Sequence, residues 1–411
     1  MSVNGISIIK KTDGCPAFGD WAVAHGLKVS WSNKKIGDVV LFDFNGNGTS
    51  DHIGIVYGIE GNYVLTVEGN TSAGSNTNGG QVQLRKRAKS GINYFVRPKY
   101  NDKFTKEMVL AAALAEVGIK ESPANSNKVK YNEWFYGSNR SAYWCCTFAC
   151  WCFAHMRTKP TGQYVGQLQT ANIKLGSDSS SVKDWQKFLR WYFGDTIIKP
   201  DGDFGKITKR FTMAFQVLER LEIDGCVGKL TRAAARKYMP KELAAQHEIA
   251  DRIVQEALRV AWPHGEKKEV YKNRPKKVYT KDLNKAYPDR SGWGASTKVG
   301  KSCDVCAGVI ARVTGADPKL ARGLGSEKQG QWHDFENDGR WTQVKPSEVR
   351  GGDFIIYKKV PDGGHVSVCV GERVVEAGHD NYFPRVGGLT KTRIDMSKKK
   401  KLGVFRAKGV N

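Results

Sequence analysis

The chain has 411 residues, of which 40% are hydrophobic, and carries a formal net charge of +24. This length predicts roughly two to four domains, and no stretch approaches the ~18–20 apolar residues of a membrane span. The N-terminal residues lack the long apolar run of a secretory signal, so another component would have to carry the protein to a target outside the cytoplasm. The positive charge points to polyanionic partners, namely nucleic acid, anionic membrane or a phosphate-rich cell wall.

The N-terminal region contains short strand-like segments separated by Gly, Asn and Asp turns, which predict a small antiparallel sheet. These segments are 37–44, 51–58, 65–70 and 92–99. His52 stands at the start of the second segment, and Glu68 and Asn70 stand at the end of the third.

The turn before His52 offers oxygen atoms at alternating positions, from Asp43, Asn45, Asn47 and Asp51. A calcium loop of the EF-hand type has such a pattern, but it needs a bidentate Glu at its twelfth position, where this chain has Gly54. We therefore favour a polar hairpin and keep a calcium site as the alternative.

Two helices are expected after this sheet, at 104–118 and 144–156, and Cys145 begins the second. A zinc site is not favoured for the clustered Cys145, Cys146, Cys150 and Cys152, because helical spacing spreads them over several faces. Cys146 is the main rival of Cys145 as a reactive thiol. Cys15, before a helix expected from Pro16, is a second rival.

A different pattern follows a Ser-rich linker. The segments 201–208 and 224–231 repeat a Gly-punctuated loop that leads into a helix, and apolar residues flank them at helical spacing. They predict a small helical repeat module of about 60 residues.

The C-terminal region repeats the first pattern with its helices in front. Helices are expected at 247–262 and 302–315, and strands at 352–359, 364–371, 373–378 and 402–408. Cys303 lies near the start of the second helix, His365 at the start of a strand, and Glu376 near the end of the next.

The spacing of cysteine and histidine tests whether the two regions correspond. His365 follows Cys303 by 62 positions, and a path from Cys145 to Met156 that continues at Met1 reaches His52 after 63. The N-terminal region is therefore interpreted as a circularly permuted domain of the same kind. Permutation is tolerated where chain ends lie close together at the surface.

A cysteine at a helix N-terminus is suited to nucleophilic chemistry, because the helix dipole and free N–H groups stabilise the thiolate. A neighbouring imidazole serves as base and a third polar group orients it. Cys145 with His52 and Cys303 with His365 fit this arrangement. Glu68 or Asn70 would orient the first histidine.

The segments at 142–153, 37–56 and 67–72 together resemble the CHAP family, the cysteine- and histidine-dependent amidohydrolases and peptidases. The resemblance implies Cys145 as nucleophile, His52 as base, and Glu68 or Asn70 as the orienting residue. The chain departs from the family in its order, because the family places its cysteine before its histidine.

The segment 181–231 resembles a three-helix peptidoglycan-binding domain, which implies binding without catalysis. Residues 247–411 resemble an NlpC-type cell-wall peptidase with the papain-like core of CHAP domains. This resemblance implies Cys303 as nucleophile, His365 as base and Glu376 at the third position, where that family often has another polar residue.

The expected fold class is α+β, with two papain-like cysteine peptidase domains, each a small antiparallel sheet with packed helices, on either side of a three-helix binding domain. The expected boundaries are 1–156 for the permuted CHAP-like domain, 157–180 for a linker, 181–242 for the binding module and 243–411 for the NlpC-like domain.

This combination resembles a bacteriophage endolysin, which reaches the wall through a holin-made membrane hole. We expect hydrolysis of peptidoglycan amide bonds without a cofactor, attraction to anionic wall polymers, and no specific nucleic acid partner. One alternative is a non-catalytic wall-binding or phage structural protein with degenerate peptidase domains. Nucleic-acid binding is suggested by charge alone, without a recognisable fold for it.

Overall fold

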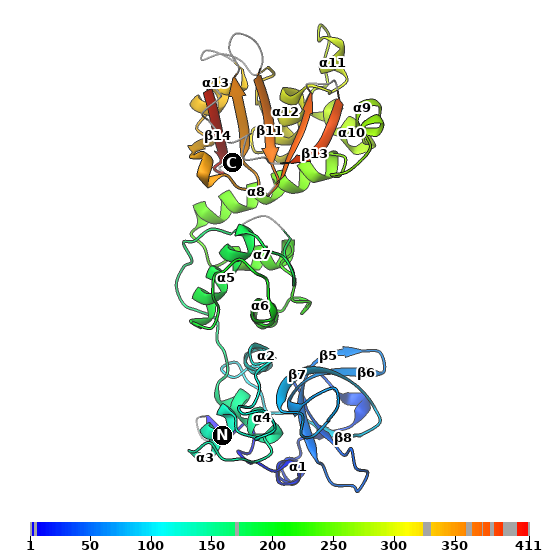
Figure 1. Ribbon diagram of the computed structural model, residues 1–411, viewed down its shortest axis with the longest axis vertical. Coiled ribbons are helices and arrows are strands. Elements are labelled where there is room, and N and C mark those ends of the chain that lie inside the picture. The colour runs from blue at the N-terminus through cyan, green and yellow to red at the C-terminus, as the bar shows by residue number, and fades with distance from the viewer. Residues whose placement is uncertain are drawn as a thin grey trace.

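A computed structural model of the chain describes residues 2–3, 6–168, 172–323, 330–358, 364–371, 373–378, 382–388 and 401–409. Three parts follow one another along its longest axis (Figure 1): a sheet with helices, a group of helices, and a second sheet with helices. Both large sheets have six strands, and every pairing within them is antiparallel. The α+β class expected from the sequence is confirmed.

The first sheet is built from residues that precede residue 100. In spatial order its strands are β3 (Lys28–Val29), β8 (Ile92–Val96), β4 (Val39–Phe42), β5 (His52–Glu60), β6 (Tyr63–Thr71) and β7 (Gln81–Ala88). Side chains alternate between the two faces of a strand. Val39 and Leu41 therefore join the main core, whereas Val40 and Phe42 join a smaller cluster.

The helices that pack with this sheet come from both sides of it in the chain. They are α1 (Cys15–Ala24), α2 (Lys106–Ala115), α3 (Lys130–Tyr136) and α4 (Cys145–Ala154). A hairpin of β1 (Ser2–Val3) and β2 (Ile6–Ser7) precedes α1, and the 3-10 turn η1 (Trp31–Asn33) precedes β4. Thr105 caps α2 by accepting a hydrogen bond from the Met108 amide. Helix α4 packs against β5, β6, α2 and α3.

The start of the chain lies beside α4. The Cys150 thiol on this helix donates to the carbonyl oxygens of Lys10, at 3.5 Å, and Thr12, at 3.4 Å. The segment that leads into α1 therefore packs on the helix that carries Cys145.

The middle part contains α5 (Ser180–Phe193), α6 (Lys206–Leu218) and α7 (Lys229–Arg236). Its two repeated loops are held in the same way by glutamines. The Gln186 amide accepts from Gly202 N and donates to Asp201 Oδ1, whereas the Gln216 amide accepts from Gly225 N and donates to Asp224 Oδ1. The sequence repeat is therefore also a structural repeat.

The middle part packs directly on the first domain. Helix α6 lies against α2, and the Arg210 guanidinium on α6 donates to Val117 O at 2.7 Å. Within the preceding segment 157–180, Tyr164 N donates to Tyr238 O at 2.6 Å, and the Tyr164, Leu168 and Ile173 side chains are buried.

The C-terminal part begins with a long helix. Its helices are α8 (Lys241–Val260), α9 (Lys268–Asn273), α10 (Lys277–Ala286), α11 (Ala295–Lys298), α12 (Cys303–Thr314), α13 (Gln331–Asn337) and the 3-10 turn η2 (Pro346–Glu348). In spatial order its strands are β13 (Tyr382–Gly388), β12 (Arg373–Gly378), β11 (Gly364–Cys369), β10 (Phe354–Lys358), β14 (Lys401–Ala407) and β9 (Trp341–Val344). Helix α12 packs on α8 and covers β11 and β12.

The two six-stranded sheets have the same strand order. The first sheet is read from β7 and the second from β13. In both, the second strand (β6 or β12) carries the glutamate, and the third strand (β5 or β11) carries the histidine. Each of these pairs is contacted by the cysteine-bearing helix, α4 or α12. The helices α2 and α4 follow their sheet in the chain, whereas α8 and α12 precede theirs.

Two main cores hold the molecule together. One runs from Ile8 to Met239 and joins the first sheet to the middle helices, and the other runs from Ile249 to Ala407. Among the described residues, no helix has the length and apolar character needed to cross a membrane.

Candidate active site

Cys145 is the first residue of α4 and is 5% exposed. No side chain caps the start of this helix. The first amides of a helix have no partner within it, so they can hold a negatively charged oxygen at the sulfur. Since α4 packs on β5 and β6, this helix end lies against the strands that carry the predicted base and orienting residue.

His52 opens β5 and is fully buried. Its Nε2 lies 3.1 Å from Glu68 Oε2 on β6, and the neighbouring Cys145 thiol favours the charged form of the ring. Because Glu68 engages Nε2, Nδ1 is the ring nitrogen left for the thiol, and it makes no hydrogen bond to any residue that the structure describes. The structure therefore brings Cys145, His52 and Glu68 together, although 93 positions separate the cysteine from the histidine.

Opposing influences set the protonation of this pair. Burial favours a neutral His52 ring, but the hydrogen bonds and charges of Cys145 and Glu68 outweigh it and raise the His52 pKa to about 9. Burial also disfavours the Glu68 carboxylate, but Arg87 and His52 lower the Glu68 pKa to about 2. The site therefore holds an imidazolium beside a carboxylate at neutral pH.

Arg87 on β7 is a member of the site that the sequence analysis missed. Its Nε donates to Glu68 Oε1 at 2.9 Å and its Nη2 to Glu68 Oε2 at 2.5 Å. The guanidinium also lies over the rings of Phe42 and Phe44. Strand β7 was not among the predicted strands, and only the antiparallel pairing of β6 with β7 could have identified this arginine.

Asn70, the second candidate for orienting His52, points elsewhere. Its Nδ2 donates to Asn127 Oδ1 at 3.2 Å, and its Oδ1 accepts from Gly80 N at 3.1 Å. It has a left-handed backbone with φ 57°. Of the two candidates, Glu68 is the one that contacts the histidine.

The rival thiols lie close to the site. Cys15, the first residue of α1, has its Sγ 3.7 Å from Cys145 Sγ. Hydrogen bonds from Cys145 and Cys146 lower the Cys15 pKa to about 5, whereas the same Cys15–Cys145 contact, together with burial, raises the Cys145 pKa. The two thiols therefore share one negative charge. Of the two thiols, Cys145 is the one whose pKa His52 lowers, which favours that charge on Cys145. Burial raises the pKa of Cys152, so it remains a packed thiol.

The second site repeats the geometry. Cys303 begins α12 and is partly buried, and His365 Nε2 lies 3.0 Å from Glu376 Oε2. Burial opposes the charged His365 ring, but Cys303 and Glu376 raise the His365 pKa to about 9. The structure thus also brings together the second predicted triad. Cys306, one turn further along, has its pKa raised by burial.

An arginine from the neighbouring strand contacts the glutamate here as well. Arg385 on β13 has its Nη2 3.3 Å from Glu376 Oε1. Arg87 and Arg385 occupy equivalent strands of the two sheets. Both sites therefore contain a Cys–His–Glu–Arg set built from the same elements.

The loop considered for calcium binds its own backbone. Asp43 accepts hydrogen bonds from Asn47 N and Gly48 N, and Asp51 accepts from Phe44 N and Asn45 N. The Asn47 side chain accepts from Thr49 N. Within the described ranges, no cluster of three or more His, Cys, Asp or Glu side chains is placed to hold a metal ion.

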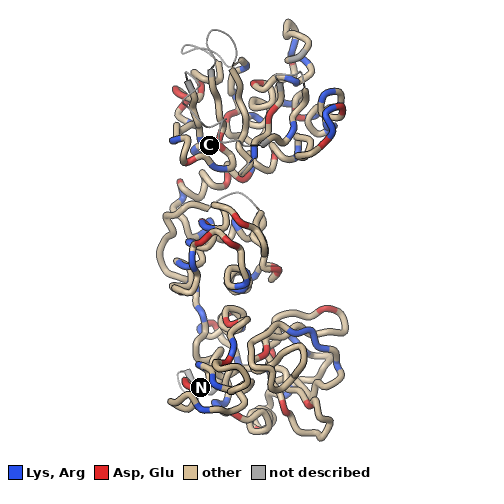
Figure 2. The backbone as a smooth tube through the Cα atoms, viewed as in Figure 1, with Lys and Arg blue, Asp and Glu red and all other residues tan. Residues whose placement is uncertain are grey.

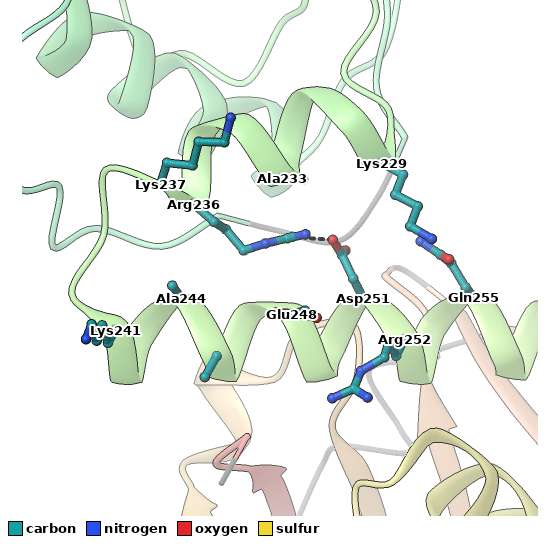
Figure 3. Close-up of a pocket in the computed structure, with 11 residues that line it drawn as sticks. Lys229, Ala233, Arg236, Lys237, Lys241, Ala244, Glu248, Asp251, Arg252 and Gln255 are labelled. Carbon is teal, nitrogen blue, oxygen red and sulfur yellow. Dashed lines mark hydrogen bonds and ion pairs between the residues drawn. The ribbon is translucent and has the colours of Figure 1, made fainter. Parts of the chain in front are cut away.

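A cavity of about 580 Å³ lies between α7 and α8 (Figure 3), and neither Cys145 nor Cys303 lines it. Its charged lining consists of Lys229, Arg236, Lys237, Lys241, Glu248, Asp251 and Arg252. Arg236 is paired with Asp251. No lining residue belongs to either Cys–His pair, so this cavity is not the place of the chemistry.

Residues 5–70 match the model of the CHAP domain family. The matched segment contains Cys15, His52 and Glu68, and it ends before α4 and Cys145. No curated protein and no solved structure matches the chain. The chain therefore contains a CHAP domain, a type of domain generally associated with cysteine-dependent hydrolysis of peptidoglycan.

Proposed function

We propose that the protein lyses bacterial cell walls by hydrolysing amide bonds in peptidoglycan, with Cys145 and Cys303 as nucleophiles. The observation that carries this proposal is the occurrence of the same Cys–His–Glu set twice, each with its cysteine at a helix N-terminus. The CHAP match supports the substrate class for the first domain.

In the proposed reaction the thiolate attacks the carbonyl carbon of the amide, and free amides at the helix start hold the oxyanion. The imidazolium then donates its proton to the departing amine, which leaves an acyl-enzyme thioester. Water, deprotonated by the now neutral imidazole, cleaves the thioester and restores the thiol–imidazole pair. Glu68 and Glu376 keep the rings oriented through both steps.

The two domains would cut different bonds. The CHAP domain would cleave the muramoyl–L-alanine amide or a bond in the peptide cross-bridge, and the C-terminal domain would cleave within the stem peptide. The C-terminal domain is proposed to be NlpC-like, on the basis of its sequence resemblance and its repetition of the first domain's strand order.

We also propose that residues 1–156 form a circularly permuted relative of the C-terminal domain. The shared strand order supports this proposal, as does the reversed placement of the helices along the chain. The packing of 10–12 on α4 supports it too, because an unpermuted chain would pass directly from this helix toward α1.

The middle helices are proposed to bind peptidoglycan, and the basic surface to attract anionic wall polymers. Lys and Arg side chains occur along all three parts of the molecule (Figure 2). The α7–α8 cavity, with five basic and two acidic lining residues, is a suitable place for a wall phosphate. We expect retention on purified walls to fall as salt rises, since screening weakens such contacts.

The chemistry is proposed to need no metal ion, because the thiolate and the imidazolium supply both nucleophile and acid. Chelation of divalent cations should therefore leave the rate of lysis unchanged. If EDTA abolished lysis and calcium restored it, the loop with Asp43 and Asp51 would be a calcium site.

Delivery is proposed to follow the endolysin route, in which a holin-made hole admits the enzyme to the wall. The test of the enzymatic proposal is loss of turbidity of purified walls, measured for Cys145→Ala, Cys303→Ala and the double variant. Lysis that persists at the wild-type rate in the double variant would refute the proposal.

The same assay distinguishes Cys145 from its rival. Cys15 lies inside the CHAP match, whereas Cys145 is the thiol that raises the His52 pKa. We expect Cys145→Ala to remove most of the lysis, because the CHAP domain is proposed to dominate, and Cys15→Ala to spare more of it. Mass spectrometry of the released muropeptides then assigns a bond to each domain.

A further inference from the structure

Cys15 and Cys145 form a buried pair of thiols at the first site. Their sulfurs are 3.7 Å apart, although 130 positions separate them in the chain, and each thiol is 5% exposed. Each stands at the first position of its own helix, α1 or α4. A disulfide bond is about 2.05 Å long, so the sulfurs would have to approach each other by about 1.7 Å to bond.

We propose that peroxide oxidises this pair to a Cys15–Cys145 disulfide, which reversibly switches off the first site. The effect on lysis rests on the proposed role of Cys145 as nucleophile, whereas the disulfide itself follows from the geometry alone. Cys15 would then be a resolving cysteine, a role that the hydrolytic reaction does not require.

The oxidation proceeds in two balanced steps. The Cys145 thiolate attacks one oxygen of hydrogen peroxide, the O–O bond breaks, and a sulfenic acid and hydroxide form. The Cys15 thiol then attacks the Cys145 sulfur, an S–S bond forms, and the sulfenic oxygen leaves as water with the thiol proton. Starting from one thiolate and one thiol, the two cysteines lose two electrons and one proton in total, and the peroxide is reduced to one water and one hydroxide.

The pair supplies the thiolate that the first step needs. Thiolate is the reactive form of cysteine, and the two thiols share one negative charge, which the His52 ring draws toward Cys145. Cys15 is the immediate neighbour, so a sulfenic acid would be trapped before further oxidation.

The second site provides an internal comparison. Among the residues that the structure describes, Cys303 has no sulfur–sulfur hydrogen bond like that of the first pair, and Cys306 is buried one turn further along its helix. Peroxide should therefore oxidise Cys303 to a sulfinic or sulfonic acid, and a thiol reductant does not reverse this oxidation.

The test is peptide mapping of the full-length protein after brief treatment with hydrogen peroxide and blocking of free thiols. Trypsin should release peptides 12–28 and 141–157 as one species, which dithiothreitol separates. The second peptide also contains Cys146, Cys150 and Cys152, so the mapping is repeated with Cys146→Ser. Linkage that persists in Cys146→Ser and disappears in Cys15→Ser is the expected result. Absence of linkage in the wild type, or its loss in Cys146→Ser, would overturn the proposal.

Lysis is followed in parallel in the Cys303→Ala background, so that only the first site contributes. Each variant is compared with itself before oxidation, after oxidation and after dithiothreitol. We expect oxidation to reduce lysis at least about tenfold, because the nucleophile is consumed, with recovery by dithiothreitol only where Cys15 is present. If the linked peptides form but the reduced protein does not lyse walls, the proposed hydrolase function fails while the disulfide stands.

Discussion

His52 and His365 are buried histidines that nevertheless favour the charged form. In each, a glutamate and a cysteine outweigh burial and raise the pKa to about 9. A raised histidine pKa contributes stability in full below about pH 6.5, and this contribution is lost as pH rises through about 9. The same range limits catalysis, because the imidazolium must protonate the departing amine.

We therefore expect lysis by either site to decline above about pH 9. In Glu68→Gln the carboxylate that stabilises the imidazolium is absent, so the alkaline limit should move to lower pH and the rate should fall at least about 10²-fold. The measurement is the pH dependence of turbidity loss in the Cys303→Ala background. The matched variant is Glu376→Gln with Cys145→Ala. An alkaline limit that stays unchanged in both would contradict the assigned role of the glutamates.

Arg87 is expected to act on the proposed reaction through Glu68, since it makes two hydrogen bonds to a fully buried carboxylate. Arg87→Ala should lower the free energy of unfolding by about 2–3 kcal/mol, because the buried charge loses a partner. It should also shift the alkaline limit of lysis, which a purely structural role would not do. Arg87→Lys should show a smaller loss of unfolding free energy and a smaller shift of the alkaline limit than Arg87→Ala.

The control for Arg87 is its neighbour Lys86, whose ion pair with Glu60 is more than half exposed. Lys86→Ala should change stability by less than about 1 kcal/mol. Denaturant unfolding and the pH profile of lysis give the two readouts. Equal losses of stability in Lys86→Ala and Arg87→Ala would remove the basis for this role.

At the level of secondary structure, the contact of α4 with β6 positions Cys145, the proposed nucleophile. Gly69 on β6 permits this contact, because a β carbon there would lie 2.6 Å from Phe148 Cβ on α4. Gly69→Ala should push the helix away, lower stability by about 1–3 kcal/mol and reduce lysis by the first site more than about tenfold. Gly74→Ala is the control, because a β carbon there meets no atom within 4 Å.

Thermal unfolding and turbidity assays in the Cys303→Ala background measure these effects. Lysis by Gly69→Ala at the rate of Gly74→Ala would show that the spacing of α4 and β6 does not limit the reaction.

The elements were predicted with uneven success. The strands with His52, Glu68, His365 and Glu376 were predicted because alternating apolar residues and turn residues are local signals. The charged strand β7 was missed because its outward residues hide the alternation, and the short helices α9 and α11 were missed because they bury little apolar surface. Helix α8 begins at Lys241, earlier than the helix expected from 247.

For the whole molecule, the two separate cores predict two unfolding transitions. Residues from Ile8 to Met239 share one core, and those from Ile249 to Ala407 share the other. Phe354→Ala should lower only the transition of the C-terminal domain, by about 3–5 kcal/mol. Differential scanning calorimetry of the full-length protein measures both transitions.

Phe188→Ala, in the middle helices, is the matched variant for the other core. It should lower the transition that the CHAP domain and the middle helices share. A single transition that moves in both variants would show that the two cores unfold together.

Local sequence patterns predicted the repeated strand segments, the two cysteine–histidine–glutamate sets and the helical repeat. They did so because periodicity, turn residues and helix starts are properties of neighbouring residues. The proposed permutation was also inferred from the sequence, because spacing along the chain survives a change of chain ends.

Tertiary structure alone decided which groups meet. It selected Glu68 over Asn70, supplied Arg87 and Arg385, and placed Cys15 against Cys145. It also packed the middle helices on the first domain. These contacts depend on strand register and on helices packed across large separations in the chain, and neither leaves a local pattern in the residues involved.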